Sequence, residues 1–402
     1  MAVILLGTLD TKGAEYGFLA DRIRAEGIEV VVIDAGVFGP AGAAGAADIG
    51  PDEVALAAGT SRAELAAAGD RGAAVAAMAR GAAVIVARLQ AEGRLDAIAA
   101  LGGSGGATLA TQAMRELPVG VPKLMVTTVA SGDTRPYVGA RDITMMPSVV
   151  DIAGINRVSA RILANAAAAV AGMARSRAPE LTRERPLIAA SMFGVTTAAV
   201  DAARARLDEL GYEVLVFHQT GVGGESMEAL VSDGFVDGML DLTTTELADE
   251  LVGGALPAHP RRLEVAGAAG VPQVVSLGAL DMVNFGPMST VPERFEDRNL
   301  YVHNTNITLM RTTPEECAQL GRRVAGKLNS ATGPTALFVP LRGISAIAVE
   351  GQPFHDPEAD EALFSAVREG IGDNVELIEL DTHINDPEFA RAAADKLHEF
   401  RR

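Results

Sequence analysis

The chain has 402 residues, of which 49% are hydrophobic and 21% charged, so it is long and apolar enough for two domains with large buried cores. Its formal net charge of −18 repels nucleic-acid phosphates and anionic lipids, and we therefore expect neither nucleic acid nor a membrane as a partner. One cysteine, Cys317, excludes an internal disulfide and a cysteine-based zinc site, and its helical surroundings predict a small core residue.

The N-terminal part predicts a β-α-β unit. Residues 3–7, "VILLG", predict a buried strand, residues 14–27 a helix ended by a glycine, and residues 28–34 a second, parallel strand. The start of the chain has no basic region before its short apolar run, which argues against a signal peptide. The apolar residues 162–173 are too few to cross a bilayer, so we expect a soluble, cytoplasmic protein.

The C-terminal part repeats this plan. Residues 187–194, 196–211 and 212–218 predict a strand, a glycine-ended helix and a strand, and strands then alternate with helices to residue 400. This alternation predicts an α/β fold with two Rossmann-like domains, mostly parallel sheets and an interdomain cleft. The charged, proline-containing residues 175–186 are the expected linker, with a boundary near Glu184 and domains over 1–183 and 184–402.

Two stretches share the pattern Gly-x-Gly-Gly-x-(Thr/Ser), namely "GSGGAT" at 103–108 and "GVGGES" at 221–226. Glycines after a strand let backbone N–H groups approach an anion, and the following helix adds its positive end. We therefore predict a phosphate or carboxylate site at Gly103, Ser104, Gly105 and Gly106, with the Thr108 hydroxyl as a further donor. The alternative is a tight turn that needs glycine for steric reasons alone, and neither stretch completes a Walker A or dinucleotide fingerprint.

Polar residues also follow two expected strands of the first domain. Asp10, Thr11 and Lys12 lie at the expected carboxyl edge, where open α/β sheets bind ligands. Lys12 would pair with a phosphate and Asp10 would hold a ribose hydroxyl or a metal ion; the alternative is an Asp helix cap beside a solvated Lys. Residues 127–139 offer further hydroxyl and phosphate ligands, namely Ser131, Asp133, Thr134 and Arg135.

The second domain offers groups that titrate near neutral pH. His218, His303 and His383 lie at apparent strand exits, and all six histidines follow position 217. A histidine there serves as a general base or a metal ligand, the alternative being a structural hydrogen bond. We predict a catalytic group of His218, Glu225, His303 and Arg311, in which the Arg311 fork pairs with a substrate carboxylate. No set of metal ligands is assigned.

Several ordered blocks of sequence resemble those of a known family. The blocks "GTLDTKG", "GGSGG", "ASGDTRPYVGARDITMM", "TGVGG", "DLTTTELADE", "HNTNITLMRTTPEE" and "HINDPEFA" resemble the Tm-one-like ATP-binding family over nearly the whole chain. The resemblance implies two Rossmann-like halves that bind ATP, with Mg²⁺ accompanying the nucleotide, and association as a homodimer. Gln219, Pro147 and Ala348 depart from the family pattern, and Ala348 stands where an Asp is expected.

We therefore favour an enzyme that holds ATP on residues 1–183 and a small polar or carboxylate substrate toward residues 184–402. One alternative is a nucleotide-regulated dimeric binding protein without turnover. A weaker alternative is a metal-dependent hydrolase or lyase that uses the C-terminal histidines. The division of labour rests on chemistry, because the first half offers anion-binding turns without a histidine and the second half offers the titrating groups.

Overall fold

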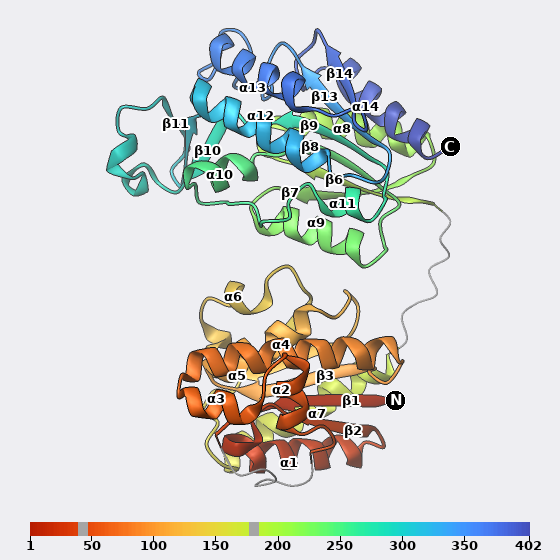
Figure 1. Ribbon diagram of the computed structural model, residues 1–402, viewed down its shortest axis with the longest axis vertical. Helices are drawn as coiled ribbons and strands as arrows, with labels where there is room; N and C mark the ends of the chain where they lie inside the picture. The colour runs from red at the N-terminus through yellow and green to blue at the C-terminus, as the bar shows by residue number, and fades with distance from the viewer. Residues whose placement is uncertain (39–46, 177–184) are drawn as a thin grey trace. The chain divides into compact units, whose positions relative to one another are not determined.

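Two parallel sheets, one in each half of the chain, organise the computed structural model, which describes residues 1–38, 47–176 and 185–402 (Figure 1). The chain divides into an N-terminal unit, Met1–Leu181, and a C-terminal unit, Thr182–Arg402. Each unit has its own sheet and its own hydrophobic core. The predicted α/β class with mostly parallel sheets is confirmed, whereas the boundary residue Glu184 lies outside the described part of the chain.

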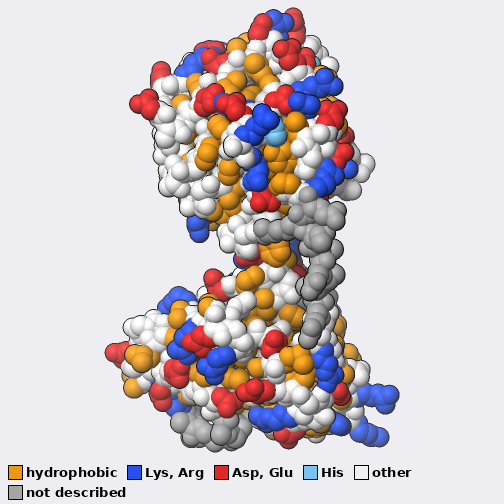
Figure 2. All heavy atoms as spheres, turned by 90° about the vertical axis from the view of Figure 1, so that its right-hand side faces the viewer, with side chains coloured by type: hydrophobic (Ala, Val, Ile, Leu, Met, Phe, Trp, Pro, Cys, Tyr) orange, Lys and Arg blue, Asp and Glu red, His pale blue; other side chains and the backbone are white. Residues whose placement is uncertain are grey.

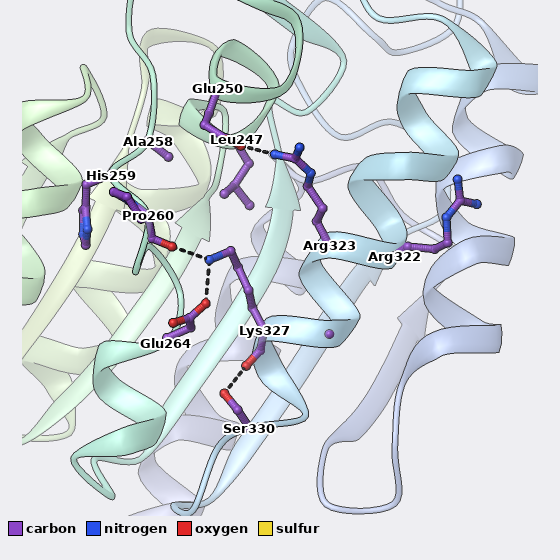
Figure 3. A pocket seen from close by; sticks show the side chains of 11 residues that line it. Leu247, Glu250, Ala258, His259, Pro260, Glu264, Arg322, Arg323, Lys327 and Ser330 are labelled. Atoms are coloured by element: carbon purple, nitrogen blue, oxygen red, sulfur yellow. Dashed lines mark hydrogen bonds and ion pairs between the residues drawn. The ribbon is translucent and has the colours of Figure 1, made fainter.

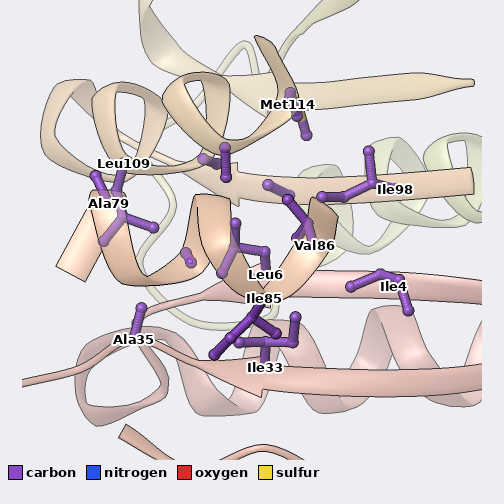
Figure 4. Packing of buried hydrophobic residues seen from close by; sticks show 14 of the residues in the cluster. Ile4, Leu6, Ile33, Ala35, Ala79, Ile85, Val86, Ile98, Leu109 and Met114 are labelled. Carbon is purple, nitrogen blue, oxygen red and sulfur yellow. The ribbon is translucent and has the colours of Figure 1, made fainter. Parts of the chain in front are cut away.

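The N-terminal sheet has five parallel strands in the order β2-β1-β3-β4-β5. Successive side chains of a strand point to opposite faces, so Val3 and Leu5 pack with α1 and α7, whereas Ile4 and Leu6 pack with α2, α4 and α5 (Figure 4). The elements are β1 (Ala2–Gly7), α1 (Leu9–Ala25), β2 (Glu29–Asp34), α2 (Pro51–Ala57), α3 (Arg62–Ala68), α4 (Arg71–Ala91), β3 (Ala97–Gly102), α5 (Ser104–Arg115), β4 (Lys123–Thr127), η1 (Thr128–Ser131), α6 (Arg135–Val138), β5 (Ile143–Pro147) and α7 (Arg157–Arg175).

Helix α4 is the one helix in the described part of the chain that is long and apolar enough to cross a membrane. Half of its apolar window is buried, and Ala79, Ile85 and Val86 lie in the core that α4 shares with the sheet and with α5 (Figure 4). This is the position of a core helix that covers a sheet. Residues 162–173, which drew attention in the sequence, lie in α7 on the opposite face.

The C-terminal unit contains six parallel strands in the order β14-β13-β9-β8-β6-β7. Helices α8 and α14 cover one face, and α9 to α13 cover the other. The elements are β6 (Leu187–Met192), η2 (Gly194–Thr196), α8 (Thr197–Glu209), β7 (Glu213–His218), α9 (Val222–Ser232), β8 (Gly238–Thr243), α10 (Glu246–Val252), α11 (Val265–Ala268), β9 (Gln273–Gly278), α12 (Pro314–Leu328), β13 (Thr335–Pro340), α13 (Pro357–Gly370), β14 (Glu376–Leu380) and α14 (Pro387–Phe400).

A small antiparallel sheet is inserted between β9 and β13 and was not expected. It joins β10 (Met282–Phe285), β12 (Ile307–Arg311) and β11 (Leu300–Asn304), with the short helices η3 (Met288–Thr290) and η4 (Glu293–Phe295) between them. His303 lies on β11 of this insert, so the expectation that it ends a strand of the parallel sheet is wrong. The pattern of an apolar run before a histidine does not distinguish a parallel strand from an antiparallel one.

Both parallel sheets share one strand order. The first strand of each unit, β1 or β6, lies between the second strand, β2 or β7, and the third strand, β3 or β8. The chain reverses direction across the sheet between β1 and β3 in one unit and between β6 and β8 in the other. In open α/β sheets, ligands bind in the crevice at the carboxyl ends of the strands at this switch point. The fold thus marks one candidate edge in each unit.

Charged side chains of both signs are visible on one face of the molecule (Figure 2). On the face drawn in Figure 2, acidic and basic side chains are interspersed on each unit. Such mixing gives this face no broad region of one sign that would attract a polyanion.

Candidate functional site

The crevice between β1 and β3 is opened by Tyr16 of α1. The two strands pair as far as Leu5 and Ala99, and beyond that point the Tyr16 hydroxyl lies between them. It donates to the Leu6 carbonyl at 2.5 Å and accepts from the Leu101 N–H at 3.0 Å. The close approach of Tyr16 requires a glycine at position 7, because a Cβ atom there would lie 2.0 Å from the Tyr16 oxygen. No sequence pattern marks this role of Tyr16.

The glycine-rich turn after β3 leads directly into α5. Gly103 is the N-cap of the helix, and without a side chain it caps none of the first N–H groups. The N–H groups of Ser104, Gly105 and Gly106 have no hydrogen-bond partner among the described residues, since the first helical bond runs from Ala107 to the Gly103 carbonyl. Ser104 and Gly105 are exposed. The turn therefore presents three donors and the positive end of a twelve-residue helix to the solvent.

The individual glycines of this turn have different reasons to be glycine. A Cβ atom on Gly102 would lie 3.0 Å from the Cα atom of Gly106, so close packing requires a glycine there. A Cβ atom on Gly105 would meet no heavy atom within 4 Å. Sterics inside the unit therefore do not account for Gly105. Thr108 lies one turn further along α5, and its hydroxyl donates to the Ser104 carbonyl at 2.9 Å.

The stretch after β1 forms the first turn of α1 rather than a loop. Asp34 at the end of β2 accepts the Leu9 N–H at 3.0 Å, so this helix start already faces a carboxylate, whose pKa is raised by burial. Asp10 accepts the Phe38 N–H at 3.2 Å, and its Oδ1 atom is buried without a partner among the described residues. Two carboxylates make the start of α1 a poorer place for a phosphate than the start of α5.

Lys12 and Thr11 are bonded to their own unit. Lys12 leaves the helical conformation with φ −128° and ψ 23°, and its ammonium group donates to the Ile152 carbonyl. No carboxylate is paired with this ammonium group among the described residues, so two of its three N–H donors have no acceptor there. The Thr11 hydroxyl is 3.1 Å from the Thr8 hydroxyl. A short movement of Lys12 would therefore release a cation.

The stretch after β4 places its two charged residues against each other. Arg135 donates to both carboxylate oxygens of Asp133, at 2.9 and 2.8 Å, and both side chains are exposed. These hydrogen bonds lower the pKa of Asp133 to about 2. Ser131 is exposed at the end of η1, and Thr134 is half-buried before α6. An anion that reaches Arg135 must compete with Asp133.

The second glycine-rich turn already holds a carboxylate of its own unit. Glu246 Oε1, at the start of α10, accepts the N–H groups of Gly221 at 2.6 Å and Gly224 at 3.2 Å. A Cβ atom on Gly223 would lie 1.7 Å from the His218 carbonyl oxygen, and one on Gly224 would lie 2.1 Å from Glu246 Oε2. The steric interpretation of glycine therefore holds for this turn, and Glu246 already occupies two of its donors.

Glu246 belongs to a buried ionic network centred on Arg262, which is fully buried. Arg262 donates to Asp241 at 2.5 and 2.7 Å and to Glu246 at 3.0 Å, and it lies 3.6 Å from Glu228. His259 adds a contact of 2.5 Å to the other oxygen of Glu228. Burial raises the pKa of Glu246 against the opposing effect of Arg262. This network fixes the turn structurally.

His218 and His303 both line a cavity of about 390 Å³ in the C-terminal unit. His218 is the last residue of β7, and its ring lies against that of Phe193 with the ring centroids 5.3 Å apart. His303 lies on β11 of the inserted sheet. Both histidines are exposed, and neither side chain has a hydrogen-bond partner among the described residues. The other lining residues are Gly194, Val195, Thr220, Ala255, Leu256, Asn284, Phe285, Gly286, Asn306, Ile307 and Leu309.

Arg311 and Glu225 are not part of this cavity. Arg311 is 4% exposed, and its guanidinium donates to Asp360 at 2.6 Å, to Thr312 at 2.9 Å, to the carbonyls of Phe354 and Asp356, and to Cys317. All its donors are used inside the unit, so the expectation that it binds a substrate carboxylate does not hold. Glu225 lies in the first turn of α9, outside the cavity lining.

A larger hollow of about 660 Å³ lies along α12 (Figure 3). Its two inward cations are already neutralised, because Arg323 pairs with Glu250 and Lys327 pairs with Glu264 at 2.7 Å. Arg322 extends to the other side of the helix (Figure 3). Within the described ranges, no three His, Cys, Asp or Glu side chains converge as metal ligands. Neither feature supplies a second candidate site.

Comparison with known proteins identifies the family. Residues 1–179 match the N-terminal domain of the uncharacterised protein family UPF0261, and residues 185–401 match its C-terminal domain. The chain belongs to UPF0261. A UPF0261 protein of Clostridium tetani is 54% identical over 396 residues, which cover 98% of each chain. The tomato (Solanum lycopersicum) ToMV resistance protein Tm-1 is 44% identical over 315 residues, 77% of this chain and 42% of that protein.

Solved structures add only a distant likeness. A UDP-N-acetylglucosamine 2-epimerase from Rickettsia bellii covers 100% of this chain and 95% of its own at 9% identity and a TM-score of 0.24. The Streptomyces glycosyltransferase SsfS6 covers 68% of this chain and 81% of its own at 14% identity and a TM-score of 0.20. Scores this low transfer no activity to a UPF0261 protein.

The UPF0261 chain thus brings its predicted residues together in two groups. The first consists of the starts of α1, with Asp10 and Lys12, and of α5, which follow the neighbouring strands β1 and β3. The second consists of His218 and His303 around one cavity. Asn284, which lines that cavity at 2% exposure, was not among the predicted residues. No local pattern marks it, because its role depends on the fold of the inserted sheet.

Proposed function

We propose that the N-terminal unit binds the phosphates of a nucleotide, ATP foremost, at the start of α5. One observation carries this proposal: the N–H groups of Ser104, Gly105 and Gly106 have no partner among the described residues and lie at a switch point of the sheet. The matching turn of the other unit is filled by Glu246. In that turn the backbone N–H donors bind a carboxylate oxygen, which supports an oxyanion as the ligand of the α5 turn.

Neighbouring groups fit the remaining parts of a nucleotide. Lys12 would leave the Ile152 carbonyl for a phosphate oxygen, and Arg135 would exchange Asp133 for one. The unpaired Oδ1 atom of Asp10 would accept a ribose hydroxyl or bind the Mg²⁺ that accompanies ATP. The family resemblance, rather than the geometry, is what favours adenosine over another base.

We further propose that the protein is an enzyme whose second ligand binds in the cavity between His218 and His303. Both imidazoles are exposed and without partners among the described residues, so either is able to accept or to deliver a proton. A nucleotide-regulated binding protein without turnover is the alternative. Product analysis after incubation with ATP and a second ligand distinguishes the two.

The nucleotide proposal is tested by calorimetric titration of the full-length protein. We expect ATP with Mg²⁺ and inorganic triphosphate both to bind, and adenosine to bind at least tenfold more weakly than ATP, because the anchoring donors face the phosphates. Adenosine that binds as tightly as ATP, or ATP that shows no heat of binding at millimolar concentration, would overturn the assignment of the α5 turn.

A further inference from the structure

We infer that the C-terminal cavity takes an uncharged aromatic or heteroaromatic ring that carries an N–H or O–H donor, and that Asn284 accepts this donor. The inference deepens the proposed second-ligand role of the cavity and rests on it. It replaces the expectation of a carboxylate substrate, which depended on Arg311. Three features of the cavity support it: its walls, its lack of charge and one unpaired acceptor.

The walls suit a planar apolar body. The volume of about 390 Å³ is within the range of small-molecule sites, and the side chains of Phe193, Leu256, Phe285, Ile307 and Leu309 line it. The Phe193 and His218 rings lie at 35° to each other, so an aromatic wall extends from the interior to the rim. A ring placed against this wall gains both apolar burial and stacking.

Charge is absent from the lining. None of the fourteen lining residues is Lys, Arg, Asp or Glu, and the histidines stand at exposed positions. An anionic ligand would lose its hydration without meeting a cation in return. Asp249, which is fully buried behind Asn284, adds a nearby negative charge when ionised and makes an anion still less favourable.

One polar atom remains unpaired. Asn284 is 2% exposed and donates from Nδ2 to Asp249 at 3.3 Å and to the Thr245 hydroxyl at 3.4 Å. Both contacts are made by Nδ2, and they fix the orientation of the amide. Oδ1 is buried and has no hydrogen-bond partner among the described residues. A buried acceptor without a donor is costly, so a ligand that supplies an N–H or O–H group is favoured there.

Three fluorinated rings test this inference on the full-length protein by ¹⁹F NMR titration. They are 4-fluorophenol, which carries a donor, 4-fluoroanisole, which keeps the oxygen and lacks the donor, and 4-fluorobenzoate, which is an anion. We expect 4-fluorophenol to bind roughly three- to tenfold more tightly than 4-fluoroanisole and 4-fluorobenzoate to bind least. Equal affinity for the first two, or a preference for 4-fluorobenzoate, would overturn the inference.

Substitutions assign the binding to the cavity. Ile307→Trp fills the space from a half-buried lining position and should abolish 4-fluorophenol binding. Val302→Trp places the same ring at a 55% exposed position of the same inserted sheet, outside the lining, and should leave binding unchanged. Asn284→Ala should bring the affinities for 4-fluorophenol and 4-fluoroanisole to within about twofold. This ratio is internal to one protein sample, so partial destabilisation does not obscure it.

An ATP titration on the same samples separates this inference from the nucleotide proposal. We expect ATP affinity to be the same in all three variants as in the parent. If ATP binds and no ring does, the inference about the cavity is wrong and the nucleotide site stands. If 4-fluorophenol binds and is lost in Ile307→Trp while ATP does not bind, the inference stands and the nucleotide site is wrong. Loss of 4-fluorophenol binding in Val302→Trp as well would place the ring elsewhere and overturn the inference.

Discussion

Glu246 accepts the backbone N–H of Gly221 at 2.6 Å, and it thereby occupies the anion position of one of two similar glycine-rich turns. The turn at Gly103 to Gly106 has no such internal carboxylate among the described residues. One sequence pattern thus has two uses in one chain: internal satisfaction in the C-terminal unit and an open donor set in the N-terminal unit. The pattern alone does not distinguish them, because Glu246 is more than twenty residues from the turn that it fills.

The open turn gives the first prediction. Gly105→Val should weaken ATP binding at least tenfold in a calorimetric titration, because the new side chain stands where a phosphate would approach the backbone. The fold should persist, since no heavy atom lies within 4 Å of a Cβ at this position. Gly17→Val, on α1 and equally uncrowded, is the matched control and should bind ATP as the parent does. Unchanged affinity in a folded Gly105→Val protein would remove the turn from the site.

The buried network gives the second prediction. Arg262→Met removes the cation from among Asp241, Glu246 and Glu228, and buried carboxylates without their partner cost about 3–5 kcal/mol. Denaturant unfolding should show this loss in the C-terminal unit. Arg342→Met is the control, because its pair with Asp381 is exposed on both sides and such solvent-screened pairs contribute little to stability. An equal, small effect in both variants would contradict the structural role of Arg262.

The third prediction separates functional from structural histidines. His218→Asn and His303→Asn should leave the thermal midpoint within about 1–2 °C of the parent, because both side chains are exposed and lack hydrogen-bond partners among the described residues. His259→Asn should lower it by several degrees, because it withdraws the partner of buried Glu228, at a cost of ~1–3 kcal/mol. Large losses in the first two variants would make His218 and His303 structural.

Buried carboxyl groups give the fourth prediction, which concerns pH. Burial raises the pKa of Asp249 to about 7 and that of Asp281 to about 6, so the folded protein binds protons that the unfolded chain has released. Through these groups the free energy of unfolding falls as the pH rises from about 4 to 7, by about 1.4 kcal/mol for each unit of raised pKa. Below pH 4 their contribution is fully present. Denaturant titrations at several pH values measure the slope.

A substitution isolates this slope. Asp249→Asn removes one of the titrating groups, so its stability should fall less steeply between pH 4 and 7 than that of the parent, whatever its stability at a single pH. Asp281 remains and keeps part of the dependence. Asp208→Asn is the control, because Asp208 pairs with Arg185 at a largely exposed position. A slope in Asp249→Asn that equals the slope of the parent would contradict the assignment.

The positions of the parallel strands along the chain could be predicted from the sequence, because strands buried on both faces are continuous apolar runs. Val3 to Leu6 is an example, and it lies where predicted. The inserted sheet was missed, since its strands of four or five residues carry polar positions such as Asn284 and Thr308. Short antiparallel strands are paired by distant residues, and that pairing leaves little trace in a local window.

Site residues were harder to predict than strands, because burial and pairing decide their chemistry. Arg311 and His303 both follow apolar residues in one segment, yet one is buried with all its donors used and the other is exposed at a cavity. Sequence proximity to a strand end therefore identifies candidates without ranking them. The unpaired atoms of Asp10 and Asn284, which rank them here, exist only in the folded chain.

The single cysteine provides a probe of how often the C-terminal unit opens. Cys317 is fully buried on α12 beside Thr312 and Arg311, and burial raises its pKa to about 11, so both access and thiolate character are suppressed while the unit is closed. A thiol reagent can react only after the helix opens. Because no other thiol competes, the rate of labelling reports how often the C-terminal unit opens. A ring bound in the cavity of the folded unit would lower the rate of Cys317 labelling, so the rate also reports binding of a ligand of unknown identity.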